Sequence, residues 1–499
     1  MAKIDREKLT LALFLLFYCV VQFFTLGRRG LDGDEGVILK AALADNWEAF
    51  WAFIAHDVHP PLYHLLARTS MNLFGVYEWS LRLPAALAGA LLIPLGYALG
   101  RVVFKKKSLA LLLAGLFTLS PYLFYFYGEA RFYSLLLLGA TLTYIAIFRM
   151  QSEKSIYWWL LFLAGALIMV WAQYLGWFIL LVEFGALVAA RQWREVKKTG
   201  IALALVGLSY VSFCKIALVQ ISGRLTEQGG LALGDNIKGL LGALYRFGTG
   251  RLVLGIEPST LLVGGWSYIL LFMISLIVPA LIILAPWRRQ KKCMLASRKN
   301  LSIILAVSAV SFVMALLVSE VGGRATRYMV YLWPFYGIFT VLGVVSLWHK
   351  VWGKIIVASF FILMLASLGK HVFSCNQAVG AREIAILLAH KVETQDAVLT
   401  KGAFAGGESV ALRFYLKKDV TISDYFSDYK PGALKNKTLT TELFINQALE
   451  THAVVWYYDF TYGNFKKEEI NGSIAENFIG KDKEEKEIVL YKITKQQGA

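Results

Sequence analysis

Long apolar runs constrain this chain more than any other feature of its sequence. The hydrophobic residues make up 57% of the 499 positions, above the roughly 45–50% of soluble domains. About eleven runs approach or reach the roughly 18–20 apolar residues that cross a bilayer, which predicts a polytopic α-helical membrane protein. The expected spans are residues 9–27, 82–104, 108–127, 132–149, 157–171, 173–190, 199–220, 259–286, 300–320, 328–348 and 352–370.

The short loops between these runs predict an orientation. With the N-terminus in the cytoplasm, all five loops on the cytoplasmic side are basic, as the positive-inside rule requires. Much of the net charge of +17 is therefore attributed to membrane orientation and not to nucleic acid binding. The five loops are residues 105–107, 149–154, 191–198, 288–299 and 350–354.

The hydropathy falls sharply after residue 370, which predicts that the rest of the chain forms a soluble domain outside the cytoplasm. Its β-type runs at 397–400, 453–458 and 487–493 alternate with helical patterns such as 381–391, which predicts a small α/β fold. We therefore expect a transmembrane module over residues 1–370, including an external loop at 28–81, and an α/β domain over residues 371–499.

The first external loop carries more ionisable groups than a connector needs. It holds the acidic pair Asp34-Glu35 in a glycine-rich setting. A carboxylate at the bilayer surface, beside apolar and basic groups, can act as a general base; a solvated acidic loop is the alternative. Two apolar segments of the loop, 46–54 and 62–74, are too short to span and are expected to form interfacial or re-entrant helices.

The same loop contains the sequence HDVHPP at residues 56–61. Two prolines set a rigid entry to a following helix, which would face His59 and Tyr63 toward the acidic pair; a plain helix start is the alternative. Asp57, His56 and His59 are also side chains that bind metals, but their spacing matches no common zinc pattern. A divalent metal at these three residues is kept as an open alternative.

Arginines gather near the external ends of the expected spans, where the positive-inside rule disfavours them. Arginine binds phosphate in a bidentate manner, so several arginines at one membrane depth suggest a lipid phosphate or pyrophosphate held there. Pairing with local acids, or with bulk lipid headgroups, is the alternative. The arginines concerned are Arg28, Arg29, Arg82, Arg131, Arg324 and Arg327.

One carboxylate, that of Glu183, lies inside an expected span. Intramembrane carboxylates are costly and are site hypotheses by default. Pairing with a polar residue on a neighbouring helix is the simpler explanation and the one expected.

The order of the polar motifs resembles the bacterial GT-C glycosyltransferases. The resemblance is greatest to the branch that contains protein O-mannosyltransferase-like enzymes and the lipid A aminoarabinose transferases, and it covers about residues 5–370. The aminoarabinose transferases place an acid and a lysine before the Pro-Pro pair, where this chain has Val58 and His59. This difference argues against assigning the chain to the aminoarabinose transferases, and against the metal site that this assignment would carry with it. The motifs are the acidic pair, HPPLYHLL (59–66), LFG (73–75), SLRLPAALAG (80–89), SPYLFYFYGEARFYSLLL (120–137) and RATRYMVYLWP (324–334).

The resemblance implies an inverting enzyme that takes a sugar from a polyprenyl-phosphate carrier. The sugar would pass to a lipid, glycan or protein acceptor on the periplasmic side of the bacterial inner membrane, and no cofactor is required. The acidic pair, with Asp34 as the base, would be catalytic, and basic residues would bind the phosphate as it leaves. The implied residues are Asp34 and Glu35 for catalysis, Arg131, Arg327, Arg82, Arg324 and Tyr328 for the donor phosphate, and His59, Tyr63, Tyr133 and Glu129 in support.

Two other functions are compatible with a polytopic chain. A transporter or flippase of a lipid-linked sugar would tend to have inverted repeats and polar sites at mid-membrane, whereas this chain concentrates its unusual charges at one face. An O-antigen-ligase-like glycan transferase would be expected to rely on a large late periplasmic loop, whereas the motifs here lie early.

Overall fold

The chain divides into two compact units. A computed structural model describes residues 5–227, 246–248, 274, 277–282, 284, 325–374, 381–401, 407–416, 420–424, 441–459, 469–481 and 487–495. Whether residues 1–370 and 371–499 work as separate domains stays a prediction. The first unit comprises Met1–Phe24, Trp47–Leu66 and Arg82–Val372, and the second comprises Thr25–Asn46, Ala67–Leu81 and Phe373–Ala499.

Helices long and apolar enough to cross a membrane confirm the polytopic α-helical class. Five such helices occur among the described residues, or up to seven if two bent helix pairs are each counted as one span. The expected number of spans stays a prediction, because the runs at 259–286 and 300–320 lie mostly or wholly outside the described residues. The five are α1 (Arg6–Leu26), α5 (Glu78–Val103), α8 (Tyr133–Ser152), the segment Arg327–Leu347 formed by η3 (Ala325–Leu332) and α17 (Trp333–Leu347), and α18 (Val351–Ser374).

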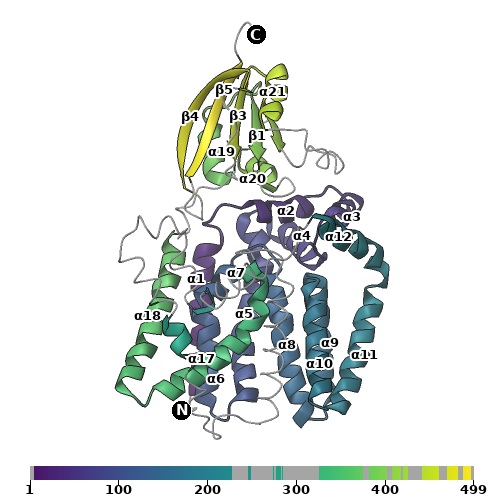
Figure 1. The fold of residues 1–499 in the computed structure, drawn as a ribbon, viewed down its shortest axis with the longest axis vertical. Helices are drawn as coiled ribbons and strands as arrows, with labels where there is room; N and C mark the ends of the chain where they lie inside the picture. Colours follow the sequence, from purple (N-terminus) through teal and green to yellow (C-terminus); the bar gives the residue numbers. More distant parts are fainter. Residues whose placement is uncertain are drawn as a thin grey trace. The chain divides into compact units, whose positions relative to one another are not determined.

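Helices α8 to α11 lie side by side in the first unit (Figure 1). Glycines let the backbones of α8 and α9 touch: a Cβ atom on Gly139 would lie 2.6 Å from the carbonyl oxygen of Gly165. Such small-residue contacts are typical of membrane helices. Between α8 and α10, the Thr143 hydroxyl donates a 2.7 Å hydrogen bond to Glu183, which confirms the expected pairing of that carboxylate. The other helices of this group are α9 (Ile156–Ala172), α10 (Leu175–Ala189) and α11 (Trp193–Ser209).

A sharp bend separates α6 (Lys107–Leu119) from α7 (Pro121–Tyr127), whose axes differ by 57°. Ser120 ends the first helix and caps the second, because its hydroxyl accepts a 3.3 Å hydrogen bond from the amide of Leu123. Proline at the first position of α7 suits a helix start, where no backbone donor is needed. Helix α7 is followed by a short turn before α8, and this turn carries Arg131.

The two short apolar segments of the first loop are helical, as predicted. They form α3 (Trp47–His56) and α4 (Leu62–Phe74); their location at the membrane surface stays a prediction. In the first unit, Gln220 of α12 (Cys214–Glu227) donates a hydrogen bond to the carbonyl of Ile54 and so ties α12 to α3. The structure adds a helix not predicted from sequence, α2 (Gly33–Ala42), which carries the acidic pair.

The C-terminal part of the second unit is built on a five-stranded mixed sheet with the order β2-β1-β3-β5-β4. Strands β1, β2 and β3 are parallel, and β5 is antiparallel to both β3 and β4. The predicted strands and helix are confirmed, while β2 and β4 were not predicted; both are edge strands, and their polar sequences carry little alternating signal. The elements are α19 (Ala381–Ala389), β1 (Ala397–Lys401), α20 (Gly407–Leu416), β2 (Thr421–Asp424), α21 (Thr441–Thr451), β3 (Val454–Asp459), β4 (Gly472–Lys481) and β5 (Glu487–Lys495).

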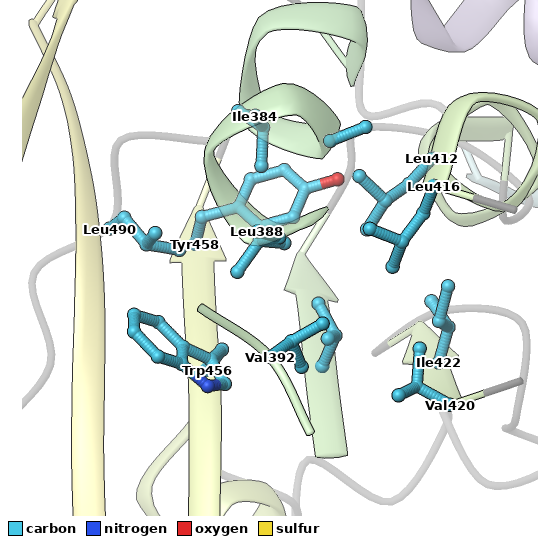
Figure 2. Packing of buried hydrophobic residues seen from close by; sticks show 12 residues of the cluster. Ile384, Leu388, Val392, Leu412, Leu416, Val420, Ile422, Trp456, Tyr458 and Leu490 are labelled. Carbon is cyan, nitrogen blue, oxygen red and sulfur yellow. The ribbon is translucent and has the colours of Figure 1, made fainter. Parts of the chain in front are cut away.

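Alternating side chains of the strands build a hydrophobic core on each face of this sheet. On one face, Trp456 and Tyr458 of β3 pack with Leu388 of α19 and Leu412 of α20 (Figure 2). On the other face, Tyr457 and its neighbours pack with α21. The sheet is thus covered by helices on both sides, and the predicted α/β class is confirmed.

Candidate active site

The acidic pair lies at the start of α2, and its two carboxylates are in different environments. Asp32 is the N-cap: its side chain accepts a 2.9 Å hydrogen bond from the amide of Glu35, and Glu35 accepts a 3.3 Å hydrogen bond from the amide of Asp32. This reciprocal pair is a capping box. Arg29 also donates to Glu35 at 2.9 Å and to Asp32 at 3.2 Å. The Glu35 side chain, which is 0% exposed, therefore stabilises the helix start.

Asp34 is the second residue of the helix and lies outside the capping box. It is partly exposed, in contrast to Glu35. A negative side chain is favoured in the first turn of a helix, where backbone amides point toward it. Of the two predicted catalytic carboxylates, Asp34 is thus the one presented at the surface of its unit.

Sequence reasoning missed the roles of Asp32 and Arg29, although a signal for the first was present. The spacing Asp32-x-x-Glu35 is a capping-box pattern with aspartate at the N-cap position. The other end of α2 is held by Arg68 of α4, whose guanidinium donates to the carbonyls of Ala42 at 3.1 Å and Ala44 at 2.6 Å. No local pattern predicts this second contact, because it joins segments more than twenty residues apart.

In the first unit, the histidines around the Pro-Pro pair gather on a buried aspartate. Asp57 lies 3.1 Å from Nε2 of His64 and 3.7 Å from Nδ1 of His59, and its side chain is 7% exposed. Burial raises the pKa of Asp57, but the neighbouring His59 and His64 rings favour the carboxylate and hold the pKa well below its usual range. The group lies at the entry to α4.

Loss of the Asp57 carboxylate is expected to destabilise the protein. In Asp57→Asn, two buried imidazoles lose the carboxylate beside them, and leaving a buried polar group without its partner costs about 1–3 kcal/mol. Since folding depresses the pKa of Asp57, its contribution is complete above the unfolded value of about 3.9 and disappears as the pH falls through the lower folded value. Thermal unfolding of the purified variant in detergent at neutral pH measures the effect, with exposed Asp45→Asn as the control. An unchanged melting temperature would contradict the assignment.

The remaining metal candidate, His56, is not part of this group. It is exposed, and its Nδ1 lies 2.8 Å from the carbonyl oxygen of Ala52 in its own helix. Within the described ranges, no set of three His, Cys, Asp or Glu side chains is arranged to hold a metal ion. Metal dependence of the protein stays a prediction.

Two of the predicted phosphate-binding arginines meet in one aromatic cluster of the first unit. The Arg131 guanidinium lies 5.4 Å from the ring centre of Phe132, and that of Arg327 lies 5.4 Å from the ring centre of Tyr328. The rings of Phe132 and Tyr328 are stacked at 6.3 Å with an interplanar angle of 11°. Segments almost two hundred residues apart in sequence therefore bring two arginines together.

His59 and Tyr133 complete this cluster. The His59 ring lies 4.7 Å from that of Phe132, and the Tyr133 ring lies 6.1 Å from that of Tyr328. Tyr133 is fully buried, its hydroxyl has no hydrogen-bond partner in the described part of the chain, and its ring contacts the two rings over which Arg131 and Arg327 lie. A buried donor beside two guanidinium groups is suited to an anion.

The other predicted site residues are either buried in the structure or outside the described residues. Arg82, in the first turns of α5, and Tyr63 of α4 are each 1% exposed, and Glu129 is 4% exposed in the turn before Arg131. Arg324 lies outside the described residues. The predicted facing of His59 and Tyr63 toward the acidic pair stays a prediction.

Comparisons with known proteins agree on the fold. Residues 58–214 match the family model described as dolichyl-phosphate-mannose-protein mannosyltransferase. The crystal structure of ArnT from Cupriavidus metallidurans in the apo state matches with a TM-score of 0.59 over 96% of this chain and 97% of that chain, at 15% identity. This chain has the ArnT-like GT-C fold. The same ArnT bound to undecaprenyl phosphate matches with a TM-score of 0.58, 15% identity and the same coverage.

The GT-C fold confirms the resemblance inferred from the sequence motifs. No curated protein matches the chain. The family-model match contains His59, Tyr63 and Arg131, whereas Asp34 and Arg327 lie outside it. At 15% identity the structural likeness establishes the fold, and the roles of these residues are argued from their own geometry.

Proposed function

We propose that this protein is an integral-membrane glycosyltransferase that moves a hexose or pentose from a polyprenyl-phosphate carrier to an acceptor hydroxyl, with inversion at the anomeric carbon. The acceptor would be a lipid, a glycan or a protein. The GT-C fold supports this proposal, as do a family-model match described as a mannosyltransferase and a similar crystal structure bound to undecaprenyl phosphate. The basic loops of the sequence support an active site on the periplasmic side of the inner membrane.

The observation that carries the proposal is the contrast between Asp34 and Glu35. Glu35 is buried in a capping box and paired with Arg29, whereas Asp34 is partly exposed on a helix held at both ends. A base must reach the proton that it removes. We therefore assign to Asp34 the removal of the acceptor hydroxyl proton, and to Glu35 the support of the turn that presents Asp34.

The cluster of Arg131, Arg327 and Tyr133 is the proposed site for the donor phosphate. As the sugar leaves, the phosphate diester of the donor becomes a monoester and gains negative charge. Preorganised donors stabilise such charge where it develops, and guanidinium groups suit phosphate geometry. His59, which lies beside Asp57 and packs in a tilted arrangement against Phe132, would support the same cluster.

Sugar release by the purified protein tests the proposal. The protein in detergent is incubated with undecaprenyl phosphate linked to radiolabelled mannose, glucose or 4-amino-4-deoxyarabinose, together with an envelope lipid extract as acceptor. Transfer of label and release of undecaprenyl phosphate are expected, because chemistry does not need two compartments. Native mass spectrometry measures carrier binding in parallel. A protein that neither binds undecaprenyl phosphate nor transfers label would contradict the proposal, and transport of the intact carrier across vesicles would favour a flippase.

A further inference from the structure

The C-terminal α/β fold makes specific contacts with the segment that carries Asp34. We propose that Arg382 and Tyr415 are positioning residues that hold the turn before α2, and with it Asp34, in place for the reaction. The inference rests on the proposed function, because it takes Asp34 as the base. All the contacts that carry it lie within the second compact unit.

Arg382, in the first turn of α19, is the first anchor. Its guanidinium donates hydrogen bonds to the carbonyl of Arg28 at 2.7 Å and to the carbonyl of Gly27 at 3.0 Å. It also pairs with the carboxylate of Glu78. One planar group thus joins three acceptors of the N-terminal part of the chain, which a guanidinium can do because its donors form a rigid fork.

Tyr415 of α20 is the second anchor. Its hydroxyl accepts a 2.9 Å hydrogen bond from the amide of Leu31, the residue before the N-cap Asp32. Its ring lies 5.4 Å from the Arg382 guanidinium, so the two anchors support each other. Helix α20 also packs against α2 itself.

The two anchors connect the turn before α2 to a distant part of the chain, whereas the local contacts of α2 do not. The capping box and Arg29 define the shape of the turn, but all their atoms lie within six residues of one another along the chain. Arg382 and Tyr415 come from residues more than 350 positions away and join the turn to a sheet with two hydrophobic cores. A base must be placed to within a fraction of an ångström, and a shift of about 1 Å can cost about 10²-fold in rate.

The test compares three full-length variants. Arg382→Ala removes the guanidinium and its hydrogen bonds. Arg382→Lys retains the positive charge beside Glu78 but lacks the planar set of guanidinium donors. Tyr415→Phe removes the hydroxyl that accepts from Leu31. The matched control is Arg413→Ala, because Arg413 of α20 donates a 2.7 Å hydrogen bond to the carbonyl of Ile422, inside the C-terminal fold. Thermal unfolding of each variant confirms that it is folded.

Hydrogen exchange and kinetics are both measured. In Arg382→Ala, amides of residues 27–42 are expected to exchange faster, and kcat for the radiolabelled donor is expected to fall about 10–100-fold. Binding of undecaprenyl phosphate should be unchanged, since the proposed phosphate cluster is not altered. Arg382→Lys should recover part of both losses, and Arg413→Ala should change neither.

The outcomes separate this inference from the proposed function. Unchanged exchange over residues 27–42 in folded Arg382→Ala would overturn the inference, and so would faster exchange with an unchanged kcat. An equal loss in Arg413→Ala would also overturn it, because it would indicate general loosening. Full transfer by Asp34→Asn would instead refute the proposed function, whatever the exchange data show.

Discussion

Replacing Asp34 by asparagine is expected to lower sugar transfer by about 10²–10⁴-fold, the usual contribution of a general base. The amide has nearly the same shape but cannot accept the acceptor proton. Asparagine keeps the helical turn, because the capping box is formed by Asp32 and Glu35 and not by this residue. Transfer from the radiolabelled donor measures the effect, and binding of undecaprenyl phosphate should stay close to that of the wild type.

Two further variants make the Asp34 experiment specific. Asp45→Asn removes an exposed carboxylate just after α2 and should leave transfer unchanged. Glu35→Gln tests the other member of the acidic pair: glutamine also fits a capping box, so the loss should be far smaller than for Asp34→Asn. If Glu35→Gln abolished transfer and Asp34→Asn did not, the two roles would be reversed.

Replacing Arg131 by alanine is expected to lower turnover by about 10²–10³-fold, as removal of a preorganised charge donor does in other enzymes. The buried guanidinium and its contact with Phe132 would both be lost. In contrast to Asp34→Asn, this variant should also bind undecaprenyl phosphate more weakly. Arg131→Lys should recover only part of the activity, because an ammonium group lacks the bidentate fork.

Arg101 provides a matched control for Arg131. It is also an arginine over an aromatic ring, 5.9 Å from the ring centre of Tyr97, but it lies in the last turn of α5, outside the proposed phosphate cluster. Arg101→Ala should leave undecaprenyl phosphate binding unchanged. Wild-type binding by Arg131→Ala, or equal losses in both variants, would show that the aromatic cluster is not the phosphate site.

Much of the fold was predictable from sequence, because helices and strands leave a periodic signal along the chain. The apolar runs predicted the membrane helices, and the short segment that became α4 matches its predicted range, Leu62–Phe74. The sequence pattern predicts strands β1, β3 and β5 because their runs of hydrophobic residues are clear. It does not predict edge strand β4, with its sequence GSIAENFIGK, because polar residues interrupt the alternation of hydrophobic residues.

The sequence by itself determined which residue types were available: an acidic pair after the first apolar run, a histidine-proline motif and a set of arginines. Which of these residues are buried, which are exposed and which lie together was decided only by the tertiary structure. Glu35 is buried against Arg29 while Asp34 is partly exposed, and Arg131 meets Arg327 across Phe132 and Tyr328. The physical reason is distance along the chain. Hydrophobic periodicity is a local property, whereas these pairings depend on side chains that only folding brings together.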